Sequence, residues 1–327
     1  MTYSYSYSKK LSTRSNALGL RASYGLSCLA AKGIFSDLSV FTADTATSAG
    51  LDRFRTQYQS SFYDVGISEQ ALIATAAGYV ASGGRAVVST FAPFLTLRAA
   101  EQIRLSLGYM NLPLVLAGLA SGTALGYLGY THCCFEDISL MTAIPNILIY
   151  TPSDAYELSC VFNDLLSLNR PTYIRLTGAS KTQPVHRSDF TTNLNDPIPY
   201  HVNGKDLLIL SSGVISSNVT SALSQLDDNI LDRLSFYTLP FIDQSSGNPL
   251  LLSLLAEFSN VLVLDEGGFN GVPSFLNKLI INHSLKINFF YECHPLRYLT
   301  CGSHDFMLSQ MNLDSHSILR RITSILF

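Results

Sequence analysis

Short runs of apolar, often β-branched residues alternate with helix-length stretches along this chain, and this alternation restricts the fold more than any other feature. The strands predicted before residue 178 are 38–43, 85–91, 112–116, 146–150 and 171–176. The helices predicted around them lie near 16–32, 69–82, 95–109 and 153–168. Strands that are apolar on both faces are typical of parallel sheets covered by helices on two sides. The pattern therefore predicts an α/β fold with a doubly wound, mostly parallel sheet.

The alternation stops at residues 178–204 and then resumes in a smaller unit. The intervening segment is polar, rich in Pro, Thr and Asn, and has no period, as expected of an interdomain linker. Beyond it the predicted strands are 206–211, 234–239, 261–265 and 287–291, and the predicted helices are 216–227, 247–258, 272–282 and 314–326. We therefore expect two domains, residues 1–177 and 205–327, each with its own doubly wound sheet.

The composition excludes several classes of protein. Hydrophobic residues make up 47% and charged residues 14% of the 327 residues, which is typical of a well-buried globular protein. A net charge of −3 gives no electrostatic reason to expect nucleic acid or an anionic membrane as a partner. No apolar run reaches the length of about 18 residues that predicts a membrane span, and the first residues lack the apolar core of a secretory signal. The low charged fraction also favours burial against partner chains.

The cysteines and the common catalytic motifs say little about function. There is no CxxC pair, so the cysteines indicate reduced thiols and a cytoplasmic protein. Phosphate-loop, dinucleotide-binding, zinc-protease and nucleophile-elbow motifs are all absent. Ser211-Ser212-Gly213 fits an anion site at a helix N-terminus or an ordinary strand-to-helix turn. We predict no metal site in this chain, because the adjacent Cys133 and Cys134 beside His132 have poor ligand spacing.

The most informative stretch is residues 64–104. Asp64-Val-Gly-Ile-Ser-Glu69-Gln precedes a helix rich in small residues, and Phe91 and Phe94 follow the next strand. Considered alone, Glu69 could be an ordinary first-turn carboxylate that the helix dipole stabilises. The two phenylalanines could likewise be ordinary core residues.

Seven segments in a fixed order make the stretch specific. They are DVGISEQ, Phe91/Phe94, Ile103–Leu107, Tyr130-Thr-His132 with Glu136-Asp137, Leu140 to Asn146, Thr151–Ala155 and Pro171–Arg175. This series resembles the pyrimidine-binding domain of transketolases and of deoxyxylulose-phosphate synthases. The resemblance covers roughly residues 12–178, and the unit from residue 205 onward resembles the transketolase C-terminal domain only weakly.

The resemblance implies a cofactor and an activating residue. Members of the family use thiamine diphosphate, which reacts through a carbanion at its thiazolium carbon after the cofactor's own amino group removes the proton. A carboxyl group hydrogen-bonded to the pyrimidine nitrogen makes that amino group basic, and the family glutamate with this role matches Glu69. Phe91 and Phe94 match the aromatic residues around the pyrimidine ring, and we assign Ile67 to the same cofactor site.

The resemblance also implies substrate-binding residues. His132 matches a family histidine that faces the reactive end of the cofactor. Arg14, Ser48 and Arg175 match positions that hold a sugar phosphate, although each also fits a surface arginine or a helix cap. A family histidine and a family aspartate that contact sugar hydroxyls fall at Ala120 and Leu128, and this departure favours a more apolar donor or acceptor.

Half of the expected cofactor site is missing. The family holds Mg²⁺ and the diphosphate through a GDG…N segment, and this sequence contains no Gly-Asp dipeptide. We therefore expect a companion chain that carries GDG…N, holds the Mg²⁺ and assembles with this chain as α2β2.

The function predicted is that of a split transketolase subunit, which transfers a two-carbon ketol unit to a small-molecule acceptor. The alternatives are a subunit that decarboxylates a 2-oxo acid, as deoxyxylulose-phosphate synthase or a 2-oxo acid dehydrogenase beta subunit does, and a non-catalytic partner subunit.

Overall fold

The computed structural model describes residues 3–177, 183–186, 188–244 and 248–327. Seven strands form the larger sheet in the order β12-β6-β7-β5-β4-β2-β3, and every pair except β12 with β6 is parallel. The strands are β2 (Leu38–Thr42), β3 (Phe62–Asp64), β4 (Arg85–Phe91), β5 (Val115–Ser121), β6 (Leu148–Tyr150), β7 (Thr172–Thr177) and β12 (Phe241–Ile242). The central strands β2, β4, β5 and β7 are buried along almost their whole length, which is why the sequence shows them as continuous apolar runs.

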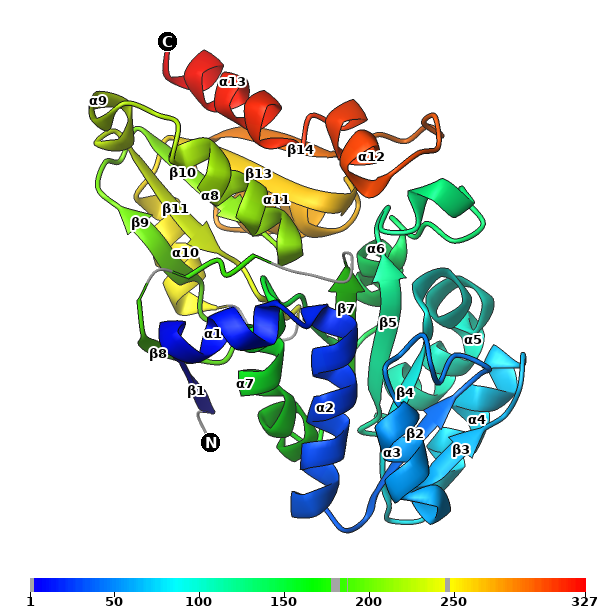
Figure 1. Cartoon of the computed structure of the whole chain (residues 1–327). Coiled ribbons are helices and arrows are strands. Elements are labelled where there is room, and N and C mark those ends of the chain that lie inside the picture. The colour runs from blue at the N-terminus through cyan, green and yellow to red at the C-terminus, as the bar shows by residue number, and fades with distance from the viewer. Residues whose placement is uncertain (1–2, 178–182, 187, 245–247) are drawn as a thin grey trace.

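A second sheet lies beyond the carboxyl ends of β5 and β7 (Figure 1). Its order is β14-β13-β10-β11-β9, and only β9 is antiparallel to its neighbour. The strands are β9 (Ile198–Val202), β10 (Leu207–Ser211), β11 (Leu234–Thr238), β13 (Asn260–Gly268) and β14 (Asn288–His294). A separate ribbon joins β1 (Ser4–Tyr7) to β8 (Phe190–Asn193). The two mostly parallel sheets confirm the predicted fold class.

Helices cover both faces of each sheet. The α-helices are α1 (Lys9–Asn16), α2 (Gly19–Ile34), α3 (Asp52–Gln57), α4 (Glu69–Ala81), α5 (Ala100–Ile103), α6 (Asp137–Ala143), α7 (Ala155–Ser167), α8 (Ser216–Leu223), α9 (Asp228–Leu231), α10 (Pro249–Ala256), α11 (Val272–Asn282), α12 (His304–Gln310) and α13 (Ser315–Leu326). In place of one helix over 95–109, π-helical segments Phe94–Arg98 and Arg104–Tyr109 flank the short α5. Such segments are frequent at functional sites.

The segment 178–204 differs from its prediction as an unstructured linker. Residues 178–182 and 187 lie outside the described residues, but β8 and β9 both fall within the segment. β9 is an edge strand in which only Ile198 is buried, so its sequence lacks the apolar run of a central strand. The second sheet therefore begins before the predicted boundary at residue 205.

One hydrophobic core runs through both sheets. It joins Leu72, Leu116 and Ile138 of the first unit to Leu210 and Val263 of the second. A separate core fills the face of the first sheet beneath α2 and α7, and another lies between the second sheet, α8 and α13. The shared core fixes how the two units sit against each other.

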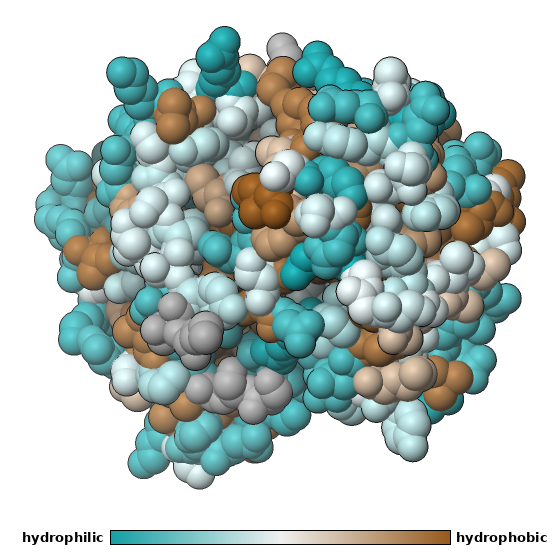
Figure 2. Space-filling model, turned by 90° about the horizontal axis from the view of Figure 1, so that it is seen from below, coloured by the Kyte–Doolittle hydropathy of each residue, from teal (hydrophilic) through white to brown (hydrophobic). Residues whose placement is uncertain are grey.

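The opposite end of the first sheet presents no broad apolar surface. Figure 2 views the molecule from the side of the strands' amino ends, where brown apolar residues are scattered among hydrophilic ones without a broad continuous patch. Isolated surface apolar residues of this kind are normal. A functional site is therefore expected at the carboxyl ends of the strands, where α/β sheets bind ligands.

A buried ion triad sits at that end, where the two units meet. Arg175 on β7 donates from Nε to Asp137 at 2.9 Å and from Nη1 to Asp265 at 3.2 Å, and all three side chains are almost fully buried. Burial alone would lower the pKa of Arg175, but the two carboxylates raise it well above its usual value, so the guanidinium stays charged. Asp137 opens α6 of the first unit and Asp265 lies on β13 of the second.

Replacing Arg175 by Met should destabilise the protein strongly. The substitution leaves two buried carboxylates without their cation, and breaking a buried pair from one side costs about 3–5 kcal/mol. Urea unfolding of Arg175→Met and of a control, Arg55→Met, measures the difference. Arg55 pairs with Asp52 on the surface, so its loss should cost less than about 1 kcal/mol. Equal effects of the two substitutions would contradict the structural role of Arg175.

Candidate functional site

A tight turn at the end of β3 delivers Glu69 to the first position of α4. Asp64 Oδ1 accepts hydrogen bonds from the backbone N–H groups of Gly66 at 3.0 Å and Asp44 at 2.9 Å. Gly66 has φ +70°, a left-handed conformation that side chains disfavour. The Asp and Gly of the segment therefore have structural roles, and they place the Glu69 carboxylate at the positive end of the helix dipole.

Glu69 is buried and has one cationic partner. Its side chain is 3% exposed, and Arg98 Nη1 donates to Glu69 Oε2 at 2.8 Å. The Arg98 guanidinium carbon lies 4.4 Å from the centre of the Phe94 ring, so one arginine links both predicted cofactor residues. Sequence reasoning missed Arg98, although its spacing of four residues from Phe94 indicates a shared helix face. Arg98 is 48% exposed and so can move away from Glu69 without a large loss of packing.

The structure brings Phe91, Phe94 and His132 together. Their ring centres lie 6.2 Å apart for Phe91 and Phe94, 6.0 Å for Phe91 and His132, and 5.5 Å for Phe94 and His132. All three contacts are edge-to-face. His132 Nδ1 also lies 3.0 Å from the Thr131 hydroxyl. An aromatic wall with an adjacent buried carboxylate can bind a planar, nitrogen-containing ring.

The loop that carries His132 is held by the second unit. Its two ends pair through backbone hydrogen bonds between Gly122 and Cys134 at 2.7 and 2.8 Å. Thr123 donates from its N–H at 2.6 Å and from Oγ1 at 2.7 Å to Glu266 Oε1, which His304 Nε2 approaches at 2.8 Å. The position of His132 therefore depends on residues more than a hundred positions further along the chain.

Aromatic contacts secure the same loop at its other end. Tyr130 Oη lies 3.0 Å from His294 Nε2 and accepts a hydrogen bond from the Leu299 N–H at 2.7 Å. The Phe135 ring stacks on His294 with 3.8 Å between ring centres. Burial lowers the pKa of His294, so its ring is neutral near pH 7 and can stack without carrying a charge.

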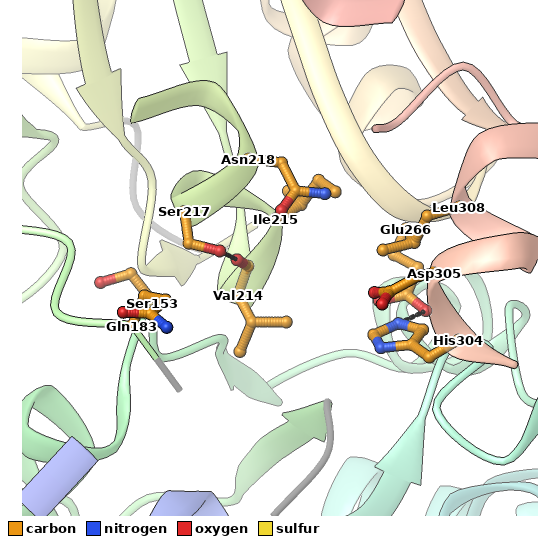
Figure 3. Close-up of a pocket in the computed structure, with 10 residues that line it drawn as sticks. All are labelled: Ser153, Gln183, Val214, Ile215, Ser217, Asn218, Glu266, His304, Asp305 and Leu308. Carbon is orange, nitrogen blue, oxygen red and sulfur yellow. Dashed lines mark hydrogen bonds and ion pairs between the residues drawn. The ribbon is translucent and has the colours of Figure 1, made fainter. Parts of the chain in front are cut away.

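Glu266 and His304 also form one wall of a cavity of about 220 Å³ at the junction of the units (Figure 3). Ser153, on the opposite side of the view, comes from the first unit, whereas Ser217 and Asn218 come from α8. Val214 and Ile215, just after the Ser211-Ser212-Gly213 turn, line this cavity as well. The acidic wall makes the cavity a poor site for an anion, so the turn is better explained as a strand-to-helix connection.

The contact between Glu266 and His304 shifts the pKa values of both side chains. Burial alone would raise the pKa of Glu266, but His304, Arg175 and the Thr123 hydrogen bond lower it to about 2. Burial alone would lower the pKa of His304, and the Glu266 carboxylate raises it above its usual value. Both shifts favour the charged forms, and Glu266 anchors Thr123 from within this pair.

A larger cavity, of about 420 Å³, lies next to the aromatic wall. Phe91 lines it together with Ser48, Ala120 and Leu128, three positions that the sequence associated with the substrate. Ala120 lies at an irregularity of β5, where the register with β7 shifts between Leu119 and Ser121, and it has φ +51°. This β-bulge sets the direction of the Ala120 side chain. Such irregularities are common beside active sites.

Two of the predicted substrate residues do not line this cavity, and one of them already has carboxylate partners. Arg175 was expected to hold a substrate phosphate, but its side chain is 1% exposed and is occupied by Asp137 and Asp265. The sequence alone did not reveal Asp265, which lies 90 positions away, as its partner. Arg14 is exposed on α1 and is not part of the cavity wall. Ile67, predicted to contact the cofactor, is 77% exposed.

The described part of the chain offers no metal centre. None of its His, Cys, Asp and Glu side chains gather in a group of three or more that could hold an ion. Cys133 and Cys134 are buried free thiols, and burial raises the pKa of Cys133 to about 11. No helix within the described residues is both long and apolar enough to cross a membrane.

Comparison with known sequences finds a family match within the first unit. Residues 28–180 match the family described as transketolase, pyrimidine binding domain. The chain is 29% identical over 285 residues to one subunit of the apulose-4-phosphate transketolase of Actinobacillus succinogenes, covering 86% of this chain and 90% of that protein. It is 25% identical over 306 residues to a protein of Methanocaldococcus jannaschii described as a transketolase C-terminal section, with 93% and 95% covered.

Longer relatives match over part of their length. The 1-deoxy-D-xylulose-5-phosphate synthase of Dechloromonas aromatica is 24% identical over 275 residues, which are 84% of this chain and 43% of the synthase. Among solved structures, one described as a split gene transketolase in an inactive beta4 tetramer has a TM-score of 0.79 at 23% identity, with 94% and 98% covered. Transketolase from Leishmania mexicana also has a TM-score of 0.79, at 17% identity, with 94% of this chain and 45% of that chain covered. These findings confirm the predicted resemblance to transketolases.

His304→Gln should weaken folding more at pH 6 than at pH 9. The pKa of His304 is raised in the folded protein, so its contribution to stability is fully present below the unfolded pKa of about 6.5. That contribution is lost as the pH rises through the folded value. Urea unfolding of wild type and His304→Gln at both pH values tests this, with exposed His316→Gln as the control. A difference that stays constant with pH would show that His304 acts without its charge.

Proposed function

We propose that this chain, a relative of the transketolases that corresponds to their C-terminal section, supplies the pyrimidine-activating half of a split transketolase-type enzyme. The observation that carries the proposal is Glu69, a buried carboxylate that Arg98 links to the aromatic wall of Phe91, Phe94 and His132. The residues lie within the segment that matches the pyrimidine-binding domain. The chain spans nearly the whole of one transketolase subunit but less than half of a deoxyxylulose-phosphate synthase, which supports the first assignment over the second.

The residues present fit one half of thiamine diphosphate. When bound, this cofactor supplies the nucleophilic carbon that takes up a two-carbon ketol unit from a ketose and passes it to an aldehyde. Glu69 would hold a proton at the pyrimidine ring nitrogen, and Phe91 and Phe94 would pack against the ring. Ile67 would complete that contact from the loop before α4. Arg98 must give up its bond to Glu69 for this to happen, and its exposed position permits the movement.

His132 and Ser48 would act on the substrate side. His132 can hydrogen-bond a substrate oxygen from the edge of the aromatic wall, where its Nδ1 is already oriented by Thr131. Ser48 offers a hydroxyl to the cavity beside Phe91. Arg14 stays a candidate for a phosphate only if a partner chain or a bound substrate extends the site toward α1.

The diphosphate and Mg²⁺ would be held by a companion chain. The described residues contain no group of metal ligands, and the sequence has no Gly-Asp dipeptide. One relative is described as a subunit and another as a C-terminal section, which supports a division over two chains. Transketolase-type assembly as α2β2 would place each cofactor between unlike chains, in the cytoplasm.

Exposed apolar side chains support such an assembly. Leu97, Leu105, Tyr109 and Met110 are all exposed on the short stretch 94–110 that also carries Phe94 and Arg98, and exposed Ile67 precedes α4. Large apolar side chains gathered beside a functional site favour a partner surface. The second unit begins near β9, before the boundary at residue 205 that the sequence predicted.

Glu69→Gln should lower the turnover number of the assembled enzyme by about 100-fold or more, because general acid–base catalysis contributes about 10²–10⁴-fold. The measurement is steady-state turnover of ketose phosphates with the companion chain, together with the dissociation constant of thiamine diphosphate. Glu257→Gln is the matched control, since Glu257 pairs with Lys205 on the surface of the second unit.

Activity that survives Glu69→Gln would refute the proposal and favour a non-catalytic role for the chain. Pyruvate decarboxylation by the same assembly, without ketol transfer, would support the alternative activity on 2-oxo acids.

A further inference from the structure

The cavity of about 420 Å³ beside Phe91 lies at the carboxyl ends of β4, β5 and β7. Its volume falls within the range of roughly 300–1,000 Å³ that is usual for small-molecule sites. It also shares Phe91 with the aromatic wall, so a molecule in the cavity would lie next to a ring bound there. The chemistry of its walls therefore bears on the substrate.

Most of the wall is aliphatic. Leu20, Leu119, Leu125 and Leu176 come from four different parts of the first unit and all line the cavity. Leu128 and Ala120 add two further apolar side chains to the same wall. A polyhydroxylated substrate placed here would lose hydrogen bonds to water without regaining them, which costs affinity at each hydroxyl.

A single charge faces this aliphatic wall. Arg21, in the first turns of α2, lines the cavity, and no carboxylate among the described residues does. Within the same part of the chain Arg21 is exposed and forms none of the ion pairs. A guanidinium beside an otherwise apolar surface can bind a carboxylate or a phosphate through two parallel hydrogen bonds.

We infer that this cavity selects a carbonyl substrate with an apolar body and one anionic group, and that Arg21 holds the anion. The inference rests on the proposed function for the reaction itself, but it concerns only which molecules the cavity accepts. A carboxylate and a phosphate meet the same chemistry at Arg21, so the experiment must separate them. Arg21 takes over the part that the sequence had given to Arg175, whose guanidinium is occupied.

The test is direct binding to the full chain without cofactor or companion chain. The probes are 2-oxohexanoate, butyl phosphate and ribose 5-phosphate, followed by calorimetry and by the methyl NMR signals of the leucines. We expect at least one of the two apolar anions to bind at least about 10-fold more tightly than ribose 5-phosphate and to shift the signals of Leu119, Leu125 and Leu176. The better of the two identifies the anion as carboxylate or phosphate.

Two substitutions sharpen the test. Arg21→Gln should weaken binding of the preferred apolar anion by about 10–100-fold, the effect of losing a charged hydrogen bond. Leu128→Asp, at a half-exposed position that should still fold, should weaken the same anion and reduce the preference over ribose 5-phosphate. Arg53→Gln, an exposed arginine on α3 outside the cavity wall, should change neither affinity.

Three results would overturn the inference. The first is ribose 5-phosphate binding as tightly as both apolar anions, and the second is unchanged affinity in Arg21→Gln. The third is that no probe binds at tens of millimolar, a concentration on the order of 100-fold above a typical KM. None of these depends on Glu69, so failure here leaves the cofactor proposal intact. Conversely, activity that survives Glu69→Gln would refute the cofactor proposal but would not change the binding preference of the cavity.

Discussion

The buried ion triad of Arg175, Asp137 and Asp265 is the constraint on which the site depends. It lies where the two units meet, and none of its three side chains is exposed enough for water to replace a lost partner. Replacing all three side chains together by well-packed hydrophobic ones could be as stable, since desolvation offsets much of what such ion pairs gain. What the triad adds is a fixed geometry, because charged hydrogen bonds tolerate little displacement. Asp265 is followed directly by Glu266, so the same strand end that binds Arg175 also anchors Thr123 and the loop of His132.

This arrangement gives the second unit a role in shaping the candidate site, whose predicted residues lie in the first unit. The second unit resembles transketolases weakly in sequence, yet it holds both ends of the loop between Gly122 and Cys134. The contacts involve few residues, mainly Glu266, His294 and His304, and the backbone N–H of Leu299.

The sequence predicted the architecture well for a physical reason. Central strands buried on both faces must be apolar throughout, so β2, β4, β10 and β11 were found close to their observed bounds. The strands that were missed are short or lie at edges: β12 has two residues, and β9 is an edge strand with one buried residue. In the site, Glu69, Phe91, Phe94 and His132 were found because a resemblance located them. The sequence did not reveal the contacts of Arg98 and Arg175, because the role of an arginine depends on its partners. One partner of Arg175, Asp265, lies 90 positions further along the chain.

The two arginines Arg175 and Arg21 show why position alone does not assign a charged residue. Arg175 lies at the carboxyl end of a central strand, the usual place for a ligand contact, yet two carboxylates neutralise it and the solvent cannot reach it. Arg21 lies on a helix with no motif around it, yet it lines an aliphatic cavity whose described wall has no carboxylate. An anion entering that cavity would find Arg21 as the cation on this wall. A guanidinium that already has its partners is part of the fold, whereas one that faces an apolar cavity without a counter-charge is available to a ligand, so the substrate end of this site is set by Arg21 and the leucines around it.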